Sequence, residues 1–343
     1  MASAHGDADF TPNPNRAIWV EGRIEDALLE RLRPEILELT ARSREPVTVF
    51  INSSGGMPNV AIGILMALRR TTPDDARVSR IITVAAPKAW SAAANLLSAG
   101  DFAIAHPDSA LLYHGGRVPL SGKQLTAEVA REGRALHTDH EISASHLAVD
   151  SFQRLQFIFS ALSPLFARHR AEAGNPTLAD LDCFHALLRG RLSPAGQRVI
   201  DLAVPLSRDY DGLFLQFRKR LRRGRAVTRT HLRKLMIYAS ADFEWETAEE
   251  GDEPWDGGLG RIADHFYFLN AYFGDHERLL EWCAAQAEPQ MACADAEELE
   301  RWPLRIFFRA LCRALQEGEN YITPADAVLL GLIDTVWEAP TTP

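Results

Sequence analysis

The segment Ala89-Trp-Ser-Ala-Ala-Ala-Asn-Leu-Leu-Ser-Ala-Gly100 decides the fold of this 343-residue chain. It follows the apolar, β-branched run 80–84, which is typical of a buried strand. Its Ala- and Leu-rich part, closed by Gly100, predicts a short helix. Ser91 is therefore expected at a helix N-terminus, where the Ala92 amide and the helix dipole favour negative charge beside its hydroxyl. Taken alone, the segment indicates an ordinary helix start, because serine is a common N-cap residue.

Short apolar runs with β-branched or aromatic residues recur on both sides of this segment. They cover 16–20, 47–51, 101–105 and 110–114, and each is bounded by Gly, Pro, Asn or Asp. Between them, 27–40 and 60–68 carry leucines and isoleucines at helical spacing. Strands that alternate with helices predict an α/β domain with buried, mostly parallel strands.

A second glycine-containing segment is Phe50-Ile-Asn-Ser-Ser-Gly-Gly56, an expected strand that runs into a paired-glycine turn and then a helix. Glycine leaves the backbone N–H groups open to a ligand, because no Cβ blocks the approach. Amides presented in this way suit a developing oxyanion. Alone, the segment is as typical of a plain strand-to-helix turn.

From about residue 122 the apolar pattern becomes helical. Helices are expected at 145–173, 177–188, 210–221, 259–287 and 294–315, with an exposed acidic loop at 246–258. The basic cluster 218–225 is interpreted as a solvated face, with an acidic or nucleic-acid partner as the alternative. After Gly318 the α/β pattern returns. Thr323 and Pro324 read as an N-cap and a first helical residue, and a last strand is expected near 333–337.

Composition sets the outer bounds of function. Hydrophobic residues make up 46% and charged residues 24% of the chain, which excludes a disordered protein. No run is long and apolar enough for a membrane helix, and the N-terminus lacks the features of a secretory signal, so a cytoplasmic protein is expected. The 4 cysteines exclude a disulfide scaffold. A net charge of −9 argues against a protein that coats nucleic acid.

The motifs occur in one fixed order. They are Asn52-Ser-Ser-Gly-Gly56, Trp90-Ser91, Leu112-Tyr-His114 and Ile322-Thr-Pro-Ala-Asp-Ala-Val-Leu-Leu-Gly-Leu-Ile-Asp334, preceded by Ile18-Trp-Val-Glu-Gly-Arg-Ile-Glu-Asp26. This set resembles the proteolytic subunit of the Clp protease family, over roughly 16–120 and 318–338. The resemblance implies an α/β fold of the ClpP/crotonase type, a spiral of ββα units, with a large all-α insertion before the C-terminal segment.

The resemblance also divides the chain. Residues 1–121 would form the first part of the ClpP-like core, 122–317 a handle region with the helical insertion, and 318–343 the C-terminal segment of the core. In the family the handle mediates stacking of rings. An insertion of this size would block stacking, replace it with another interface, or cover the active site, and the sequence leaves these three outcomes open.

For catalysis, the resemblance implies a triad. Ser91 would be the nucleophile and His114 the general base. The family has an aspartate as third member, and the matching position here holds Glu319, which is one methylene longer. A solvated glutamate is an equally good interpretation of that position. Asp180 or Asp182 is a weaker alternative for the carboxylate.

The remaining implied roles belong to the substrate and the oxyanion. The backbone amides of Gly56 and Ala92 would donate to the oxyanion. Gly55 and Met57 belong to the segment that would flank an extended peptide and bind it through main-chain hydrogen bonds. Trp90 stands where the family has a small residue, and we expect it to narrow the site or alter its specificity.

The implied function is that of a serine endopeptidase acting on peptides or unfolded protein segments inside a homo-oligomer, without metal or organic cofactor. The chain begins almost at its first strand, so docking of the usual ATP-driven unfoldase is not expected, and an ATPase partner is left open. One alternative is an inactive ClpP-like scaffold whose helical insertion binds a partner. Another is an acyl-CoA enzyme of the crotonase superfamily, against which Ser91 and His114 both argue.

Overall fold

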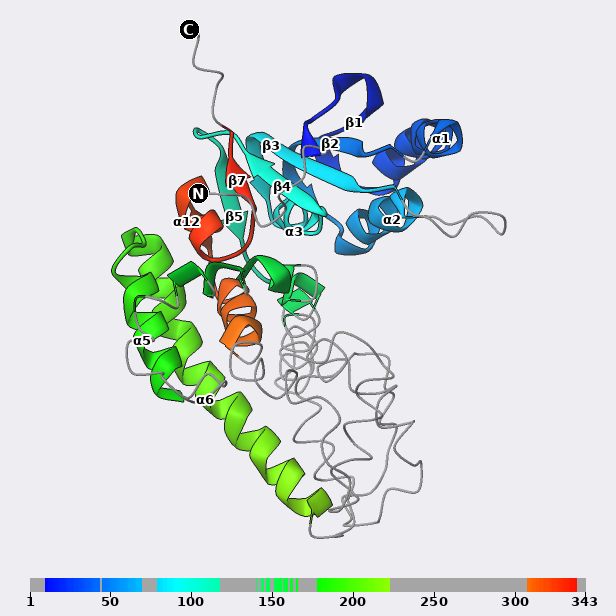
Figure 1. Cartoon of the computed structure of the whole chain (residues 1–343). Helices are drawn as coiled ribbons and strands as arrows, with labels where there is room; N and C mark the ends of the chain where they lie inside the picture. Colours follow the sequence, from blue (N-terminus) through cyan, green and yellow to red (C-terminus); the bar gives the residue numbers. More distant parts are fainter. Residues whose placement is uncertain are drawn as a thin grey trace, which may run out of the picture.

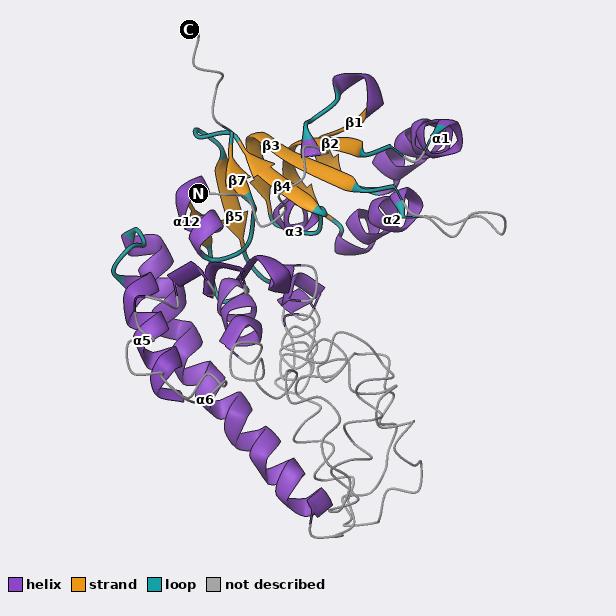
Figure 2. Cartoon of the chain, viewed as in Figure 1, coloured by secondary structure: helices purple, strands orange, loops and turns teal. Residues whose placement is uncertain are grey.

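The structure is a computed structural model. It describes residues 10–43, 45–69, 79–117, 178–222 and 307–337, with residue 140 and short helical stretches between 143 and 165. Side chains of the 178–222 segment are described from 182 to 208. Figures 1 and 2 show a twisted sheet with helices packed against it and a further layer of helices below.

The centre of the molecule is a 7-stranded sheet in which β1, β2, β3, β4 and β7 lie side by side and parallel. β5 pairs in parallel with β3, and β6 pairs antiparallel with β5. The strands are β1 (Ala17–Ile24), β2 (Val47–Gly56), β3 (Ile81–Trp90), β4 (Phe102–Ala105), β5 (Ala110–Tyr113), β6 (Asn320–Ile322) and β7 (Thr335–Val336). Parallel strands covered by helices confirm the α/β fold expected from the alternating pattern.

Strand β3 changes its partner halfway along. Its first half, 82–85, pairs with β4, whereas 88–90 pairs with β5. The cis peptide Ala86–Pro87 lies between the two halves. The end of β3 therefore leaves the main row of strands together with β5, and the chain turns at Ser91 into the next helix.

Helices on one side of the sheet bury its apolar face. In α1 (Asp26–Arg42), Leu28, Leu32 and Ile36 are buried, at the helical spacing that the sequence predicts. α2 (Pro58–Leu68) packs on α1, and α3 (Ala92–Ser98) packs on β2 and β3. A single apolar cluster runs from β1 through these helices to the helical residues 307–315.

The C-terminal segment returns to the sheet as expected. α12 (Pro324–Leu329) begins with Thr323 as N-cap, and its side chain accepts a hydrogen bond of 3.1 Å from the Asp326 amide. Gly331, with a φ of +72°, lies just past the end of this helix. Strand β7 then pairs with β4, so residues far apart in sequence become neighbours.

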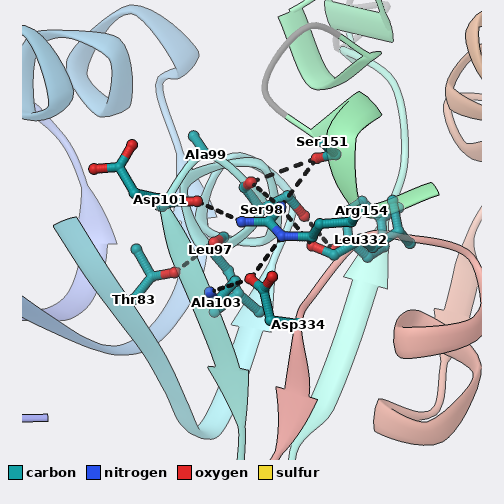
Figure 3. A network of polar contacts seen from close by, with 12 residues as sticks. Thr83, Leu97, Ser98, Ala99, Asp101, Ala103, Ser151, Arg154, Leu332 and Asp334 are labelled. Atoms are coloured by element: carbon teal, nitrogen blue, oxygen red, sulfur yellow. Dashed lines mark hydrogen bonds and ion pairs between the residues drawn. The ribbon is translucent and has the colours of Figure 1, made fainter. Parts of the chain in front are cut away.

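A buried polar network ties this segment to α3 (Figure 3). The Arg154 guanidinium donates from Nε to Asp334 Oδ2 at 2.7 Å and from Nη1 to the Ser98 carbonyl at 2.7 Å, and it also donates to the Gly100 carbonyl. Asp334 Oδ2 accepts a further bond of 2.7 Å from the Ala103 amide. The two side chains are only 6% and 1% exposed, so one ion pair holds a helix end, β4 and the C-terminal segment together.

In the helical region, one of the two long described helices agrees with the sequence prediction and the other differs from it. α5 (Leu178–Arg189) matches the expected helix 177–188. α6 (Pro194–Arg222) begins 16 residues before the expected start at 210, and Pro205 lies inside it. The helix continues because Val199, Ile200 and Ala203 form a buried stripe that packs into the core. The helices expected at 259–287 and 294–306, the acidic loop 246–258 and most of the basic cluster lie outside the described residues.

No helix in the described part of the chain is long and apolar enough to cross a membrane.

Candidate active site

Ser91 has an unusual backbone conformation. Its φ is +58° and its ψ is −127°, and among the described residues it is the only non-glycine with positive φ. Side chains with a Cβ rarely adopt such angles, so they mark a strained turn. The Ser91 amide donates to the Leu112 carbonyl at 2.7 Å, and its carbonyl accepts from the Ala94 and Asn95 amides. The hydroxyl thus stands on a sharp strand-to-helix turn, a geometry found for catalytic serines.

Of the two glycines of the 50–56 segment, Gly55 lies against this turn and Gly56 lies against β1. A Cβ on Gly55, whose φ is +82°, would come within 2.4 Å of the Trp90 carbonyl and 2.6 Å of Ser91 Cβ. A Cβ on Gly56 would come within 2.2 Å of the Ile24 carbonyl. The turn at the end of β2 is therefore packed directly on Ser91, and both positions require glycine for close approach.

A cavity of about 720 Å³ opens beside these residues. Ser91, Ala92, Gly55, Gly56 and His114 all line it, so the fold brings together five of the residues that the sequence singled out. The rest of the cavity wall comes from β1, β2, α2, the α3 region and segments after β5. These lining residues are Arg23, Ser54, Pro58, Asn59, Ala61, Ile62, Leu65, Asn95, Leu96, Ala99, Gly116, Arg117, Ser143, His146, Leu147 and Gln316.

His114 follows β5 and is half-buried. Its Nδ1 lies 2.6 Å from the carbonyl oxygen of Gly115. The Gly115 amide in turn donates to the Gln316 carbonyl at 3.0 Å, which links this turn to the C-terminal segment. With the proton on Nδ1, the Gly115 carbonyl accepts it, and Nε2 is left as the unprotonated nitrogen.

Glu319 lies next to this region but does not line the cavity. Its carboxylate forms an ion pair with Arg117, and the two side chains are 49% and 59% exposed. The hydrogen bond and charge of Arg117 lower the pKa of Glu319, and His114 adds a smaller effect in the same direction. Among the described residues Glu319 bonds to Arg117 rather than to His114, so its role as third triad member stays a prediction.

The alternative carboxylates lie elsewhere. Asp182 pairs with Arg208 at 3.6 Å on an exposed part of the helical region, and it does not line the cavity. The side chain of Asp180 lies outside the described residues.

Met57 and Trp90 flank the cavity without lining it. Met57 is the N-cap of α2, and its amide donates to the Ile24 carbonyl at 2.8 Å. The Trp90 ring meets Tyr321 edge-on at 6.4 Å between centroids, and the Lys88 ammonium lies 5.2 Å from it. The substrate contact expected of Met57 therefore stays a prediction, and the Trp90 side chain packs on β6 rather than narrowing this cavity.

Three of the lining residues that had no predicted role in this site carry guanidinium or imidazole side chains. Arg23 belongs to the Gly-Arg-Ile stretch of β1, Arg117 comes three positions after His114, and His146 comes from the helical region. Burial lowers the pKa of His146, and Arg309 lowers it further. The sequence offered one signal for Arg23 and Arg117, because each is a cationic residue in or close to one of the motifs. Within the described part of the chain no group of His, Cys, Asp and Glu side chains could hold a metal ion.

Residues 13–156 match the family model of the Clp protease, and this part of the chain is ClpP-like. The matched range contains Ser91, His114 and both glycines, and it ends before the segment that carries Glu319. A comparison with curated proteins found no match to the chain.

Proposed function

We propose that the protein is a serine peptidase in which Ser91 is the nucleophile and His114 the general base. The observation that carries this proposal is the strained backbone of Ser91 on the wall of a cavity that His114 shares. Strain of this size persists where the surrounding structure enforces it, and it is concentrated at functional sites. The Clp protease match over 13–156 supports the same reaction class.

In the proposed reaction, Ser91 Oγ attacks the carbonyl carbon of a peptide bond. Nε2 of His114 takes the hydroxyl proton and later delivers it to the leaving amine. Water then attacks the acyl-enzyme, with His114 again acting as base. The contact between Nδ1 and the Gly115 carbonyl supports this role, because it favours the tautomer whose Nε2 accepts a proton.

The oxyanion formed in each step needs donors close to Ser91. Ala92 is the first residue of α3, so its amide has no acceptor within the helix. The close packing of Gly55 on Ser91 keeps the turn that holds Gly56 beside the same point. The amides of Ala92 and Gly56 are therefore our proposed oxyanion donors, and Gly55 and Met57 the proposed contacts for the peptide main chain.

Glu319 acts electrostatically in this proposal. His114 contributes to lowering the pKa of Glu319, so this carboxylate would be an anion near the imidazolium that forms during the proposed reaction. The Gly115 carbonyl, rather than a carboxylate, orients the ring in the resting state. We further propose peptides or unfolded protein segments as substrates, a homo-oligomer as the working form and a cytoplasmic location.

Labelling with a fluorophosphonate probe tests the proposal, with the adduct read by intact mass and located by peptide mapping. We expect one adduct on the wild type and none on Ser91→Ala. Ser54→Ala is the matched control, because Ser54 lines the same cavity and lies outside the proposed machinery. An adduct that survives in Ser91→Ala, or a folded wild type that takes no label, would overturn the assignment of Ser91.

A second candidate is an inactive ClpP-like scaffold that binds a partner. The ion pair between Glu319 and Arg117 favours it, because it engages the carboxylate that a triad requires. The same labelling distinguishes the two, since a scaffold needs no activated serine.

A further inference from the structure

Within the described part of the chain, the charged side chains that line the cavity are of one sign. They are Arg23 and Arg117, and none of the described Asp or Glu residues lines it. His114 and His146 are its other titratable lining residues. These cationic side chains contrast with the net charge of −9 of the whole chain, and they favour an anionic ligand in the cavity.

Arg23 lies on the Gly55 side of the cavity. It is opposite Gly55 in the register of β1 and β2, immediately after a register shift at Gly22. Its side chain is exposed and makes no ion pair with any described residue. An unpaired guanidinium on a cavity wall keeps all of its hydrogen-bond donors for a ligand.

Arg117 lies on the His114 side. Its partner Glu319 is 49% exposed and lies outside the cavity lining, so the pair is open to solvent. Exposed pairs of this kind are held weakly, and a second carboxylate can share the planar guanidinium. The two arginines thus flank the Ser91 turn from two different segments of the chain.

We infer that Arg23 and Arg117 are specificity-determining residues that select substrates with a carboxylate side chain close to the scissile bond. This inference rests on the proposed peptidase function. The arginine side chains match carboxylates in geometry and charge, and two of them on one cavity wall favour an anionic side chain there. A lysine or arginine side chain of the substrate in the same place would face Arg23 and Arg117, so basic peptides are disfavoured.

The test is a scan of fluorogenic decapeptides in which one position at a time carries Glu, Gln or Lys. We expect the wild type to cleave the best Glu peptide about fivefold faster in kcat/KM than its Gln counterpart, with Lys slowest. The ratio of Glu to Gln falls toward one in Arg23→Gln, in Arg117→Gln and at high salt, where charge interactions are screened. Arg117→Lys retains part of the ratio.

Arg33→Gln is the matched control, because Arg33 is exposed on α1 outside the cavity and the variant makes the same change in charge. It keeps the wild-type ratio. A wild-type ratio near one at every position, or a ratio unchanged in both cavity variants, overturns the inference while leaving the peptidase assignment intact.

Binding separates this inference from the proposed reaction. Fluorescein-labelled Glu, Gln and Lys peptides are titrated into Ser91→Ala and followed by anisotropy, which requires no turnover. Tighter binding of the Glu peptide that is lost in Ser91→Ala/Arg23→Gln supports acidic selection even where labelling of Ser91 fails. Equal binding of all three peptides, or displacement by single-stranded oligonucleotide at lower concentration than by the Glu peptide, overturns it.

Discussion

The two ends of α3 are built in opposite ways. At its N-terminus, Ser91 has a strained backbone and lies on the wall of a cavity. At its C-terminus, the carbonyls of Ser98 and Gly100 are fixed by Arg154, whose side chain is only 6% exposed. A strained turn needs a rigid support, because otherwise the chain relaxes to an ordinary conformation. From this comparison we expect the strained turn at one end of the helix to depend on the buried ion pair at the other end.

Removing the support has the largest expected effect. Arg154→Met leaves the buried Asp334 carboxylate without this ion pair, although the Ala103 amide still donates to it, and should lower the free energy of unfolding by about 3–5 kcal/mol. Urea denaturation measures the loss. Arg189→Met is the control, since Arg189 forms an exposed pair with Asp201 and its loss should change stability little. An Arg154→Met protein as stable as the wild type would show that α3 does not rely on this pair.

Protonation of His185 is expected to lower the free energy of unfolding through the helical layer, away from the Arg154 ion pair. Its ring lies 4.0 Å from that of Phe307, and neither ring nitrogen has a hydrogen-bond partner among the described residues. Burial lowers the pKa of His185 from 6.5 to about 4, while Asp182 raises it slightly and Arg208 lowers it.

The unfolded state therefore takes up this proton before the folded state does. The stability that His185 contributes is complete above about pH 6.5 and is lost as the pH falls toward 4, by about 3 kcal/mol in all. In His185→Phe this part of the acid destabilisation should disappear, as measured by urea denaturation between pH 7 and pH 4. The wild type and the variant losing stability in parallel would contradict the prediction.

Gly55→Ala changes the packing only at the N-terminal end of α3, where the Ser91 backbone is strained. The added Cβ meets the Trp90 carbonyl and Ser91 Cβ, so we expect the turn to shift and the rate of fluorophosphonate labelling to fall about 100-fold. Gly22→Ala is a closely matched control, because Gly22 has nearly the same φ, +79°, and no atom within 4 Å of an added Cβ. Equal rates in the two variants would mean that backbone strain, rather than contact with Ser91, governs the reactivity.

The smallest expected effect is a difference in stability that reports the cost of the strained Ser91 backbone. Ser91→Gly removes the Cβ that makes a φ of +58° unfavourable, so it should be about 1 kcal/mol more stable than Ser91→Ala. Thermal denaturation of the two variants gives the difference. Should Ser91→Ala prove the more stable, the positive φ would carry no cost and the contrast between the ends of α3 would lose its basis.

Local patterns predicted most of the core. Strands β1 to β5 and β7 and the helices α1 and α2 followed from the spacing of apolar residues, and the start of α12 followed from Thr323 and Pro324, whereas the short strand β6 was not predicted. The start of α6 was missed because Pro205 argues against a helix, whereas burial of Val199, Ile200 and Ala203 outweighs its cost.

The site was predictable as far as it is built from short motifs. Ser91, Ala92, Gly55, Gly56 and His114 meet at one cavity as the motif order suggested. The partner of Glu319 was not predictable, because Arg117 is 202 positions away and no local rule connects the two. The positive φ of Ser91 also has no signature in composition, because it depends on how distant segments such as the Gly55 turn pack around it.

The pairing of β6 with β5 has a consequence for biosynthesis. The ribosome makes His114 long before it makes the strand that lies beside it and the carboxylate that anchors Arg154. A nascent chain that ends before residue 316 lacks the carbonyl that holds the Gly115 amide. The turn next to His114 is therefore completed only once residues 316–322 have been made, well after Gly55, Ser91 and His114 themselves.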